Sequence, residues 1–510
     1  MAGKNWFLIV VCVVAVPLVF IANLYVLVNF QHAEDRNQAY LPKVIVVTGL
    51  SIAIFQVLMF PLDVSNRSAC SQNVVASACD FTLPMEQLWH FVHMTTALYV
   101  FIVIPFAMFF YEADSELTMR GKLLSATKMV SMSFTVLALV FGIAYGLAGF
   151  VDYEVERLES GLVPLGRSLD GVSSCILPDA GAIGGLLCDA IATQAKETWS
   201  MRTSFPVYVA AITSIIGWLL FMVFAGVGAV ALPLDWIHAF VNRPRTWMTR
   251  SEYIKEAGVL GKRATDIKRA ATALRQEEMN NGRTRKWRKD MAAVSQAMSL
   301  LEEDEDRLLE CYPQGEDADV SWTFTVMSYW AKLVGGVVST IATMLWVVHI
   351  ILYVFSDPPV HPFLNDLFVE LDKAFPLFGI AAFALFCFYL IIIVMKGNMK
   401  LGLCLVVFTI HPMRLGNTLM SSFLFNTALI MVCSVAVIQF CATAFAVYAN
   451  ETDIQRIFGD EIENLRGIKY LYKYHVFLYS FFVCGAITSL YFMIVGPRPP
   501  RRKLAHDDDV

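Results

Sequence analysis

The stretch FPVYVAAITSIIGWLLFMVFAGVGAVAL at residues 205–232 decides the fold class, because it contains no charged side chain. A helix needs about 20 apolar residues to cross the hydrocarbon core of a bilayer, and this stretch is long enough. The whole chain has the same character, since 57% of its 510 residues are hydrophobic and only 16% are charged. No soluble globular domain of this size needs such a balance. The sequence therefore predicts an integral membrane protein whose first partner is the lipid bilayer.

Stretches of this kind recur along the chain, and we count nine. They lie at 6–30, 42–62, 89–111, 129–151, 205–232, 333–356, 376–395, 419–448 and 475–496. The first is too long for a signal peptide, and no small-residue cleavage site follows it, so we expect a retained helix. We predict an all-α, polytopic helical membrane protein with about nine transmembrane helices.

The spans predict four regions of the chain. An N-terminal bundle at 1–232 includes loops at 63–88 and 152–204, and a soluble segment follows at 233–332. A C-terminal bundle at 333–496 and a tail at 497–510 complete the chain. Of the loop at 152–204, only the two ends are expected to be helical.

Cysteines predict the orientation. Lys and Arg favour a lumenal or extracellular N-terminus and a cytosolic C-terminus only weakly, once the long segment at 233–332 is discounted. In this topology four cysteines lie in lumenal loops: Cys70, Cys79, Cys175 and Cys188. Paired cysteines fit an oxidising compartment, and we favour the two local disulfides. The alternative is four reduced thiols, because spacing alone does not prove a bridge.

Two Asn-x-Ser/Thr sequons, at Asn66 and Asn450, also lie on the predicted lumenal side. Each is only a few residues beyond the end of an apolar stretch. A bulky glycan so close to the lipid headgroups is not expected to be added efficiently. We therefore predict that both sequons stay empty.

Two further segments suggest helix contacts. Gly142, Gly146 and Gly149 form a small-residue face, which favours packing inside the bundle, with a homodimer seam as the alternative. The segment 401–417 starts with an apolar run too short to span and continues through His411, Pro412 and Arg414. It predicts either a re-entrant element that lines a substrate path or an amphipathic turn between two helices.

The predicted helix interiors contain no Asp, Glu, Lys or Arg. Neutral polar residues remain there: Asn23, Gln56, His90, His93, His349, Asn426 and Gln439. His90 and His93 share a helix face, but no third ligand accompanies them, so we expect interhelical hydrogen bonds rather than a metal site. The soluble segments contain no hydrolase triad, P-loop or dinucleotide motif. We expect a protein that is not an enzyme, with no cofactor and no nucleic-acid partner.

The segment 233–332 carries two heptad stripes that predict an antiparallel helical hairpin. The first stripe contains Leu260, Ile267 and Leu274, and the second contains Trp287, Met291, Val294, Met298 and Leu301. Between the stripes, Asn280, Asn281 and Gly282 tolerate the backbone of a tight turn. We expect this hairpin to dock a membrane or cytosolic protein partner. The alternative is a solvated linker with ordinary charged faces.

Five segments carry a family resemblance: NFQHAEDRNQAYLPK at 29–43, PLDVSNRSAC at 61–70, TLPMEQLW at 82–89, IPFAMFFYEAD at 104–114 and IHPMRLGNTLMSSFLFN at 410–426. In this order they resemble the lipocalin-interacting membrane receptor family, also called the limb-region membrane protein or LIMR family, especially its plant and protist members. The resemblance implies the same nine-helix layout. Because Asn66 lies inside PLDVSNR, the resemblance also implies a structural role for that residue.

The resemblance implies a job in transport or signalling. Members include a lysosomal protein that assists cobalamin export with an ABC transporter, a surface receptor that internalises a lipocalin, and adaptors in receptor signalling. We therefore expect a receptor-like or escort component in a lysosomal, vacuolar, other endomembrane or plasma membrane. The alternative is a transporter or channel whose path follows the neutral polar residues and the 401–417 element.

Overall fold

The computed structural model of the chain describes residues 6–32, 35–36, 40–71, 83–113, 118–156, 196–244, 247–281, 285–312, 318–356, 358–375, 378–401, 413, 418–450 and 452–495. Within these ranges, nine helical segments are long and apolar enough to cross a membrane. Each overlaps one of the predicted spans, so the predicted number and order of apolar helices are confirmed. The described chain forms two compact units, and their boundaries fall inside α8 (Phe205–Val241), α11 (Ala318–His349) and α17 (Val476–Val495).

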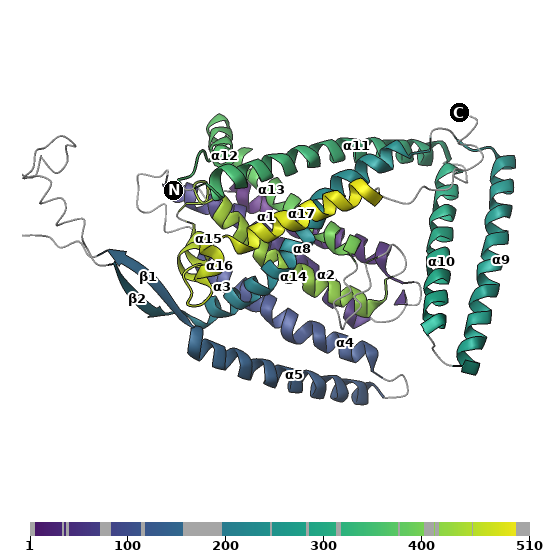
Figure 1. The fold of residues 1–510 in the computed structure, drawn as a ribbon. Coiled ribbons are helices and arrows are strands. Elements are labelled where there is room, and N and C mark those ends of the chain that lie inside the picture. The colour runs from purple at the N-terminus through teal and green to yellow at the C-terminus, as the bar shows by residue number, and fades with distance from the viewer. Residues whose placement is uncertain are drawn as a thin grey trace, which may run out of the picture. The chain divides into compact units, whose positions relative to one another are not determined.

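The first unit contains residues 1–228 and 345–484, and thus helices from both predicted bundles. Besides parts of the three shared helices, its elements are α1 (Trp6–Phe30), α2 (Tyr40–Ser71), α3 (Met85–Leu98), η3 (Tyr99–Val103), α4 (Ile104–Glu112), α5 (Met119–Ala148), β1 (Phe150–Glu156), β2 (Lys196–Arg202), η4 (Ile350–Val354), α12 (Phe363–Ala374), α13 (Phe378–Leu401), α14 (Met420–Ala444), α15 (Asp453–Gln455), η5 (Arg456–Ile462) and α16 (Lys469–Lys473) (Figure 1).

Helix α14 is the core of the first unit. It contacts α2, α3, α4 and α13, and 83% of its span is buried, against 6% for α5. Such a helix is apolar on all sides, because it meets protein in every direction. The few polar side chains on α14 must therefore find partners inside the protein.

Among the described residues, two candidate spans contain a π-helical turn, η3 within Met85–Glu112 and η4 at the end of Trp322–Val354. α3, η3 and α4 continue into one another from Met85 to Glu112. Pro105 follows η3 and has no N–H to bond the preceding turn, which gives a physical reason for the local widening.

The two ends of the loop at 152–204 are strands, so the prediction of helical ends there is wrong. β1 pairs antiparallel with β2 from Phe150 opposite Arg202 to Glu156 opposite Lys196. The strand sequence FVDYEVE alternates apolar and charged residues, which is the period of a strand with two different faces. Arg466 joins this ribbon to the segment after η5, with its Nη2 2.9 Å from Oδ1 of Asp152.

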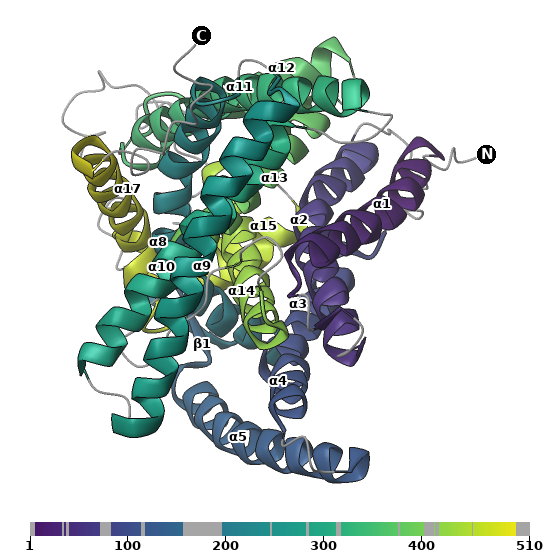
Figure 2. The same cartoon turned by 90° about the vertical axis from the view of Figure 1, so that its right-hand side faces the viewer.

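The second unit contains residues 229–344 and 485–510. Its soluble part is the pair α9 (Arg250–Asn281) and α10 (Arg285–Cys311), which lie side by side (Figure 2). Where α8 meets α11, Gly335 and Gly336 leave room for Trp236 and Ile237. Because α9 and α10 lie side by side, the described residues confirm the predicted helical hairpin.

Candidate functional site

Three of the family-like segments meet at Asp35. This carboxylate is 5% exposed and accepts a hydrogen bond from the Tyr111 hydroxyl at 2.9 Å and another from the Met420 amide at 3.1 Å. Next to it, Thr418 exchanges backbone hydrogen bonds with Phe30 and His32. The group, which we call the Asp35 junction, ties α1, α4 and α14 at one end of the bundle.

The other two family-like segments meet at Asp63, near the opposite end of α2. Its Oδ2 accepts from the Trp89 indole at 2.9 Å and from the Ile454 amide at 3.1 Å, and the residue is 2% exposed. Beside it, the Asn66 side chain donates to the Leu83 carbonyl and accepts from the Leu83 amide. We call this group the Asp63 junction. It supports the structural role that the resemblance implied for Asn66.

Asp63 also corrects a sequence-based statement. The apolar stretch ends at residue 62, but α2 continues to Ser71 and the apolar span extends to Asn66. A carboxylate therefore does lie within a span, and the statement that helix interiors contain no acidic residue is wrong for α2. Residues 63–71 continue the helix for about two and a half turns beyond the predicted run, and hydropathy did not predict them because it measures composition and not helix ends.

Most of the neutral polar residues make interhelical hydrogen bonds. Asn23 donates to Ser51 at 3.0 Å, and Asn398 donates to Asn426 at 3.0 Å. The carbonyl oxygen of Gln56 on α2 accepts from Thr96 and from Ser434, which links three helices. Such bonds are the usual way to place a polar group in a helical membrane bundle.

The histidines have separate partners. His93 bonds through Nδ1 to the Trp89 carbonyl at 2.7 Å, and His90 lies 4.0 Å from Glu86. Both contacts are within α3, so the prediction of interhelical hydrogen bonds for these two histidines is wrong for the described contacts. His349 bonds to the Ala444 carbonyl at 2.9 Å and so satisfies the last turn of α14. Among the described residues, no group of three metal-binding side chains comes together.

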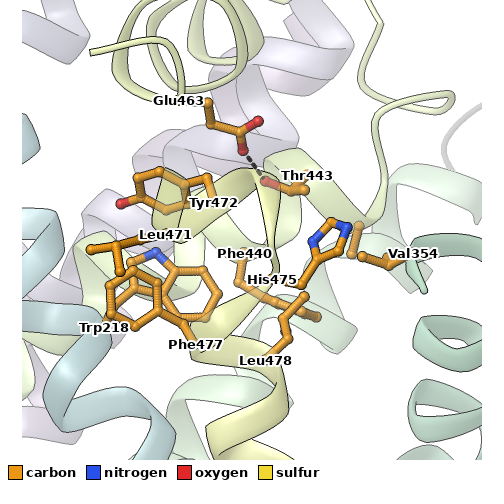
Figure 3. A pocket seen from close by; sticks show the side chains of 11 residues that line it. Trp218, Val354, Phe440, Thr443, Glu463, Leu471, Tyr472, His475, Phe477 and Leu478 are labelled. Atoms are coloured by element: carbon orange, nitrogen blue, oxygen red, sulfur yellow. Dashed lines mark hydrogen bonds between the residues drawn. The ribbon is translucent and has the colours of Figure 1, made fainter. Parts of the chain in front are cut away.

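A cavity lies at the end of α14 and is our candidate ligand site (Figure 3). It has room for about 40 Å³, enough for a few water molecules. We call it the Glu463 pocket, and its lining residues come from α8, η4, α14, α16 and α17 and the segments between them: Trp218, Val354, Phe440, Thr443, Ala444, Glu463, Leu471, Tyr472, His475, Phe477 and Leu478.

Glu463 is the chemically distinctive residue of this pocket. One carboxylate oxygen accepts from the Thr443 hydroxyl at 2.7 Å (Figure 3). Burial of the carboxyl group raises its pKa to about 7, and the nearby Asp460 charge adds to this, while the Thr443 hydrogen bond opposes it. The residue therefore titrates near neutral pH, although it keeps some exposed surface.

Two neighbours of Glu463, Tyr472 and His475, also have shifted pKa values. Burial raises the pKa of the Tyr472 phenol and lowers the pKa of the His475 imidazole, so both groups favour their neutral forms. The backbone of His475 has a φ of 49°, in the left-handed region that few side chains adopt. This residue turns the chain from α16 into α17 and brings its ring to the pocket (Figure 3).

Gln439 anchors the wall of the pocket from inside α14. Its side-chain oxygen accepts from the Trp218 indole at 3.0 Å and the Tyr472 hydroxyl at 3.2 Å, and also from the Ser214 hydroxyl. Its amide nitrogen is buried without a partner among the described residues. α8, α14 and α16 are thus fixed around one side chain, which positions Trp218 and Tyr472 at the cavity.

The hairpin is the second candidate site. Of the predicted stripes, Leu260, Leu274 and Trp287 are buried, while Ile267, Val294 and Leu301 are half-buried. The Trp287 indole donates to the Leu274 carbonyl at 3.0 Å, close to the tip. At the base, Met248, Leu260, Leu308 and Cys311 form a core. These side chains therefore pack between the two helices.

Two members of the stripe stay outside the seam. Met291 and Met298 are each 42% exposed. They lie two turns apart on α10 and are available to a partner. In the acidic run at 302–306, Asp304 lies 3.4 Å from Arg263 of α9, an exposed pair that contributes little stability.

Several predicted residues lie outside the described parts of the chain. These are Cys79, Cys175, Cys188, His411, Pro412, Arg414 and Gly282. Cys70 belongs to α2, but its side chain is not described. The disulfides and the re-entrant element therefore stay predictions.

The other predicted small-residue and glycan features are described. Among the described residues, no atom lies within 4 Å of where a Cβ would stand on Gly142 or Gly146, so the prediction that these two glycines pack inside the bundle is wrong for the described part of the chain. Asn450 is exposed, but the Thr452 of its sequon is 2% exposed and bonds to the Ala449 carbonyl and the Gln455 amide. That the Asn450 sequon stays empty therefore stays a prediction.

Sequence reasoning missed three acidic residues: Asp35, Asp63 and Glu463. Asp35 and Asp63 lie just outside predicted apolar stretches, and Glu463 lies in the segment between two of them, where a charge looks solvated. For the first two a signal existed, because they belong to the family-like segments at 29–43 and 61–70. For Glu463 no local signal existed, since its burial depends on residues of α14 and α16.

Comparison with known proteins places the chain among membrane proteins. The family model for LMBR1-like membrane proteins matches residues 8–298 and 275–492. No solved structure matches the chain. Because the family model covers most of the chain, the assignment of the chain to this family does not depend on a single motif.

Full-length relatives come from plants and a protist. LIMR family proteins of Arabidopsis thaliana and Oryza sativa are 49% and 48% identical over 500 and 501 residues, which cover 98% of this chain and 98% of each relative. A LIMR family protein of Dictyostelium discoideum is 31% identical over 98% of this chain and 99% of its own length. The chain therefore belongs to the LIMR family of LMBR1-like multi-pass membrane proteins.

Proposed function

We propose that this protein is a non-enzymatic, receptor-like or escort component that holds a partner protein at a membrane through the α9–α10 hairpin. The observation that carries the proposal is that the hairpin has two groups of apolar side chains, one buried in its seam and one exposed. Its seam is closed by its own side chains, while Met291 and Met298 are left exposed. Flexible, polarizable methionines suit a surface that accepts a protein partner.

The proposal includes an orientation, with the N-terminus lumenal or extracellular and the hairpin and C-terminus cytosolic. Within the first unit, the segment 453–475 contacts the Asp63 junction through Ile454 and the β1–β2 ribbon through Leu465, whereas the Asp35 junction lies beyond the other end of α2. The placement of these groups at opposite ends of α2 supports two distinct membrane faces. The four loop cysteines support the end with the Asp63 junction as the oxidising one.

The most specific form of the proposal is a role in lysosomal or vacuolar cobalamin export beside an ABC transporter, or in receptor signalling and endocytosis. It rests on the family resemblance alone, because the names of the relatives state no cargo. A second copy of the chain is also a candidate partner, through the open Gly142 and Gly146 face of α5.

The test is a paired charge substitution at the exposed methionines. Met291→Glu with Met298→Glu should reduce partner co-purification about tenfold, while the circular dichroism spectrum stays unchanged. Met279→Glu is the matched control, since Met279 is 74% exposed on the same hairpin but outside the stripe. Equal loss in the control, or full binding by the double variant, contradicts the proposal.

A transporter or channel is the second candidate. It is favoured by buried amide nitrogens of Gln56 and Gln439 that have no partner among the described residues, because such groups attract water into a bundle. Purified protein alone, reconstituted in vesicles, decides between the two. Substrate flux without any partner protein would exclude the escort proposal.

A further inference from the structure

The Glu463 pocket contains a negative charge without a counter-charge. Among the described residues, no Lys or Arg lines the cavity, and the hydrogen bond that the Glu463 carboxylate accepts comes from the uncharged Thr443 hydroxyl. A carboxylate in such a place must be protonated or paired with a cation. The pocket therefore has the electrostatics of a cation receptor.

Aromatic rings supply the rest of the wall. Trp218 and Phe477 stack with their centroids 5.4 Å apart, and Tyr472 lies 5.7 Å from Phe477. Figure 3 shows these rings and Glu463 around the same space. Aromatic faces attract organic cations, whereas a metal ion would require several oxygen ligands. Among the described lining residues, the Glu463 carboxylate is bonded to the Thr443 hydroxyl, while the Tyr472 hydroxyl is bonded to Gln439.

The position of the pocket indicates where the cation comes from. Its lining includes Val354, Ala444 and Phe477, which lie at or next to the ends of three candidate spans. Span ends lie at the level of lipid headgroups. Both water-soluble amines and amine-bearing lipid headgroups reach this level.

We propose that the Glu463 pocket binds an alkylammonium group, with the Glu463 carboxylate as counter-ion and the rings of Trp218, Tyr472 and Phe477 as the surrounding wall. The size of the cavity admits the ammonium and its first carbon atoms, so the remainder of the ligand extends outward. The group belongs either to a free amine or to the headgroup of phosphatidylethanolamine. This binding is independent of the docking function proposed for the hairpin.

A proton competes with the amine for Glu463. The titratable groups around it are Asp460 and Glu461 on η5, Tyr472 on α16 and His475 before α17. The lining residues from α8, η4 and α14 are uncharged. Because only the ionised carboxylate pairs with an ammonium, amine binding should strengthen as the pH rises from 6 to 8.

The first experiment uses the full-length purified protein at pH 8 with ethylammonium chloride as the probe, against sodium chloride at equal ionic strength. A saturable rise in melting temperature with ethylammonium alone is expected. Glu463→Gln should abolish it, and Asp460→Asn should keep it, because Asp460 is exposed and does not line the cavity. No rise, or the same rise in Glu463→Gln, overturns the proposal.

A second variant covers the case in which Glu463→Gln does not fold. Phe477→Leu keeps an apolar side chain but removes one aromatic face, so the affinity for ethylammonium should fall about two- to fivefold. Unchanged affinity in this variant contradicts the aromatic wall.

The lipid arm separates the two sources. In nanodiscs of phosphatidylethanolamine and phosphatidylglycerol, native mass spectrometry should detect retained phosphatidylethanolamine on the wild type and not on Glu463→Gln if the ligand is a headgroup. An ethylammonium effect without lipid preference identifies a free amine. A melting temperature that responds to pH but to neither amine means that the site binds only a proton, which overturns the proposal.

Discussion

Gly397 and Gly228 permit a close crossing of α13 and α8. A Cβ on Gly397 would overlap the Phe224 carbonyl, and one on Gly228 would overlap the Ile393 carbonyl. Each glycine thus faces the backbone of the other helix, which is the role that small residues have in membrane bundles. Neither contact is visible in the sequence, since both glycines lie in ordinary apolar runs.

Gly397→Ala should therefore destabilise the first unit. The added methyl group meets a carbonyl that belongs to a rigid helix, and overpacking of this kind costs about 1–3 kcal/mol. The melting temperature and the monodisperse fraction after detergent extraction should both fall. Gly142→Ala is the control and should be neutral or slightly stabilising, because no atom lies within 4 Å and alanine favours a helix. Equal behaviour of the two variants would refute the close-crossing argument.

Asp63 provides a second residue-scale prediction. Asp63→Ala removes the acceptor of both the Trp89 indole and the Ile454 amide, and each stranded donor costs about 1–3 kcal/mol. Cleavage of the 445–475 region by a protease should become faster, and the melting temperature should fall. Asp63→Asn retains a side-chain oxygen and should have a smaller effect. A protease pattern unchanged in Asp63→Ala would show that the junction does not hold this region.

At the scale of elements, the hairpin depends on its seam. Ile267 and Val294 are half-buried between α9 and α10, so Ile267→Asp with Val294→Asp places two charges against apolar neighbours. We expect rapid proteolysis within 250–311 and loss of partner co-purification, with membrane insertion intact. Ala270→Asp is the control, because Ala270 is exposed on α9. Partner binding by a hairpin shown to be unfolded would refute the docking proposal.

Helices were predictable where the pattern that identifies them lies within one segment of the sequence. Hydropathy located all nine spans among the described residues, and heptad stripes located the hairpin. The alternation in FVDYEVE was also a sufficient strand signal, but the loop composition obscured it. Its pairing with residues 196–202 was not predictable, because residues 157–195 separate the strands and register depends on contacts distant in sequence.

Sites were less predictable than elements, because they depend on several elements at once. The neutral polar residues could be named from the sequence, and the geometry then gave Gln56 and Gln439 partners on other helices. The Glu463 pocket could not be predicted, since its lining residues run from Trp218 to Leu478. At the scale of the whole molecule, packing of segments distant in sequence buries Glu463, which looks like a surface residue in the sequence, and raises its pKa.

The stability of the whole molecule should therefore depend on the protonation of Glu463. Its pKa in the folded protein is about 7, above the usual 4.5, so the folded state binds the proton more tightly than the unfolded state. The resulting stabilisation is complete below pH 4.5 and is lost as the pH rises through 7. The shift corresponds to about 3 kcal/mol.

Melting temperatures measured from pH 5 to pH 8 test this dependence through the difference between wild type and Glu463→Gln. A difference is needed because His475, whose pKa is lowered by burial, has the opposite effect and destabilises the folded state as the pH falls. The wild type should lose more stability than the variant between pH 6 and pH 8. Parallel profiles would mean that Glu463 is ionised throughout this range and that its protonation does not stabilise the fold.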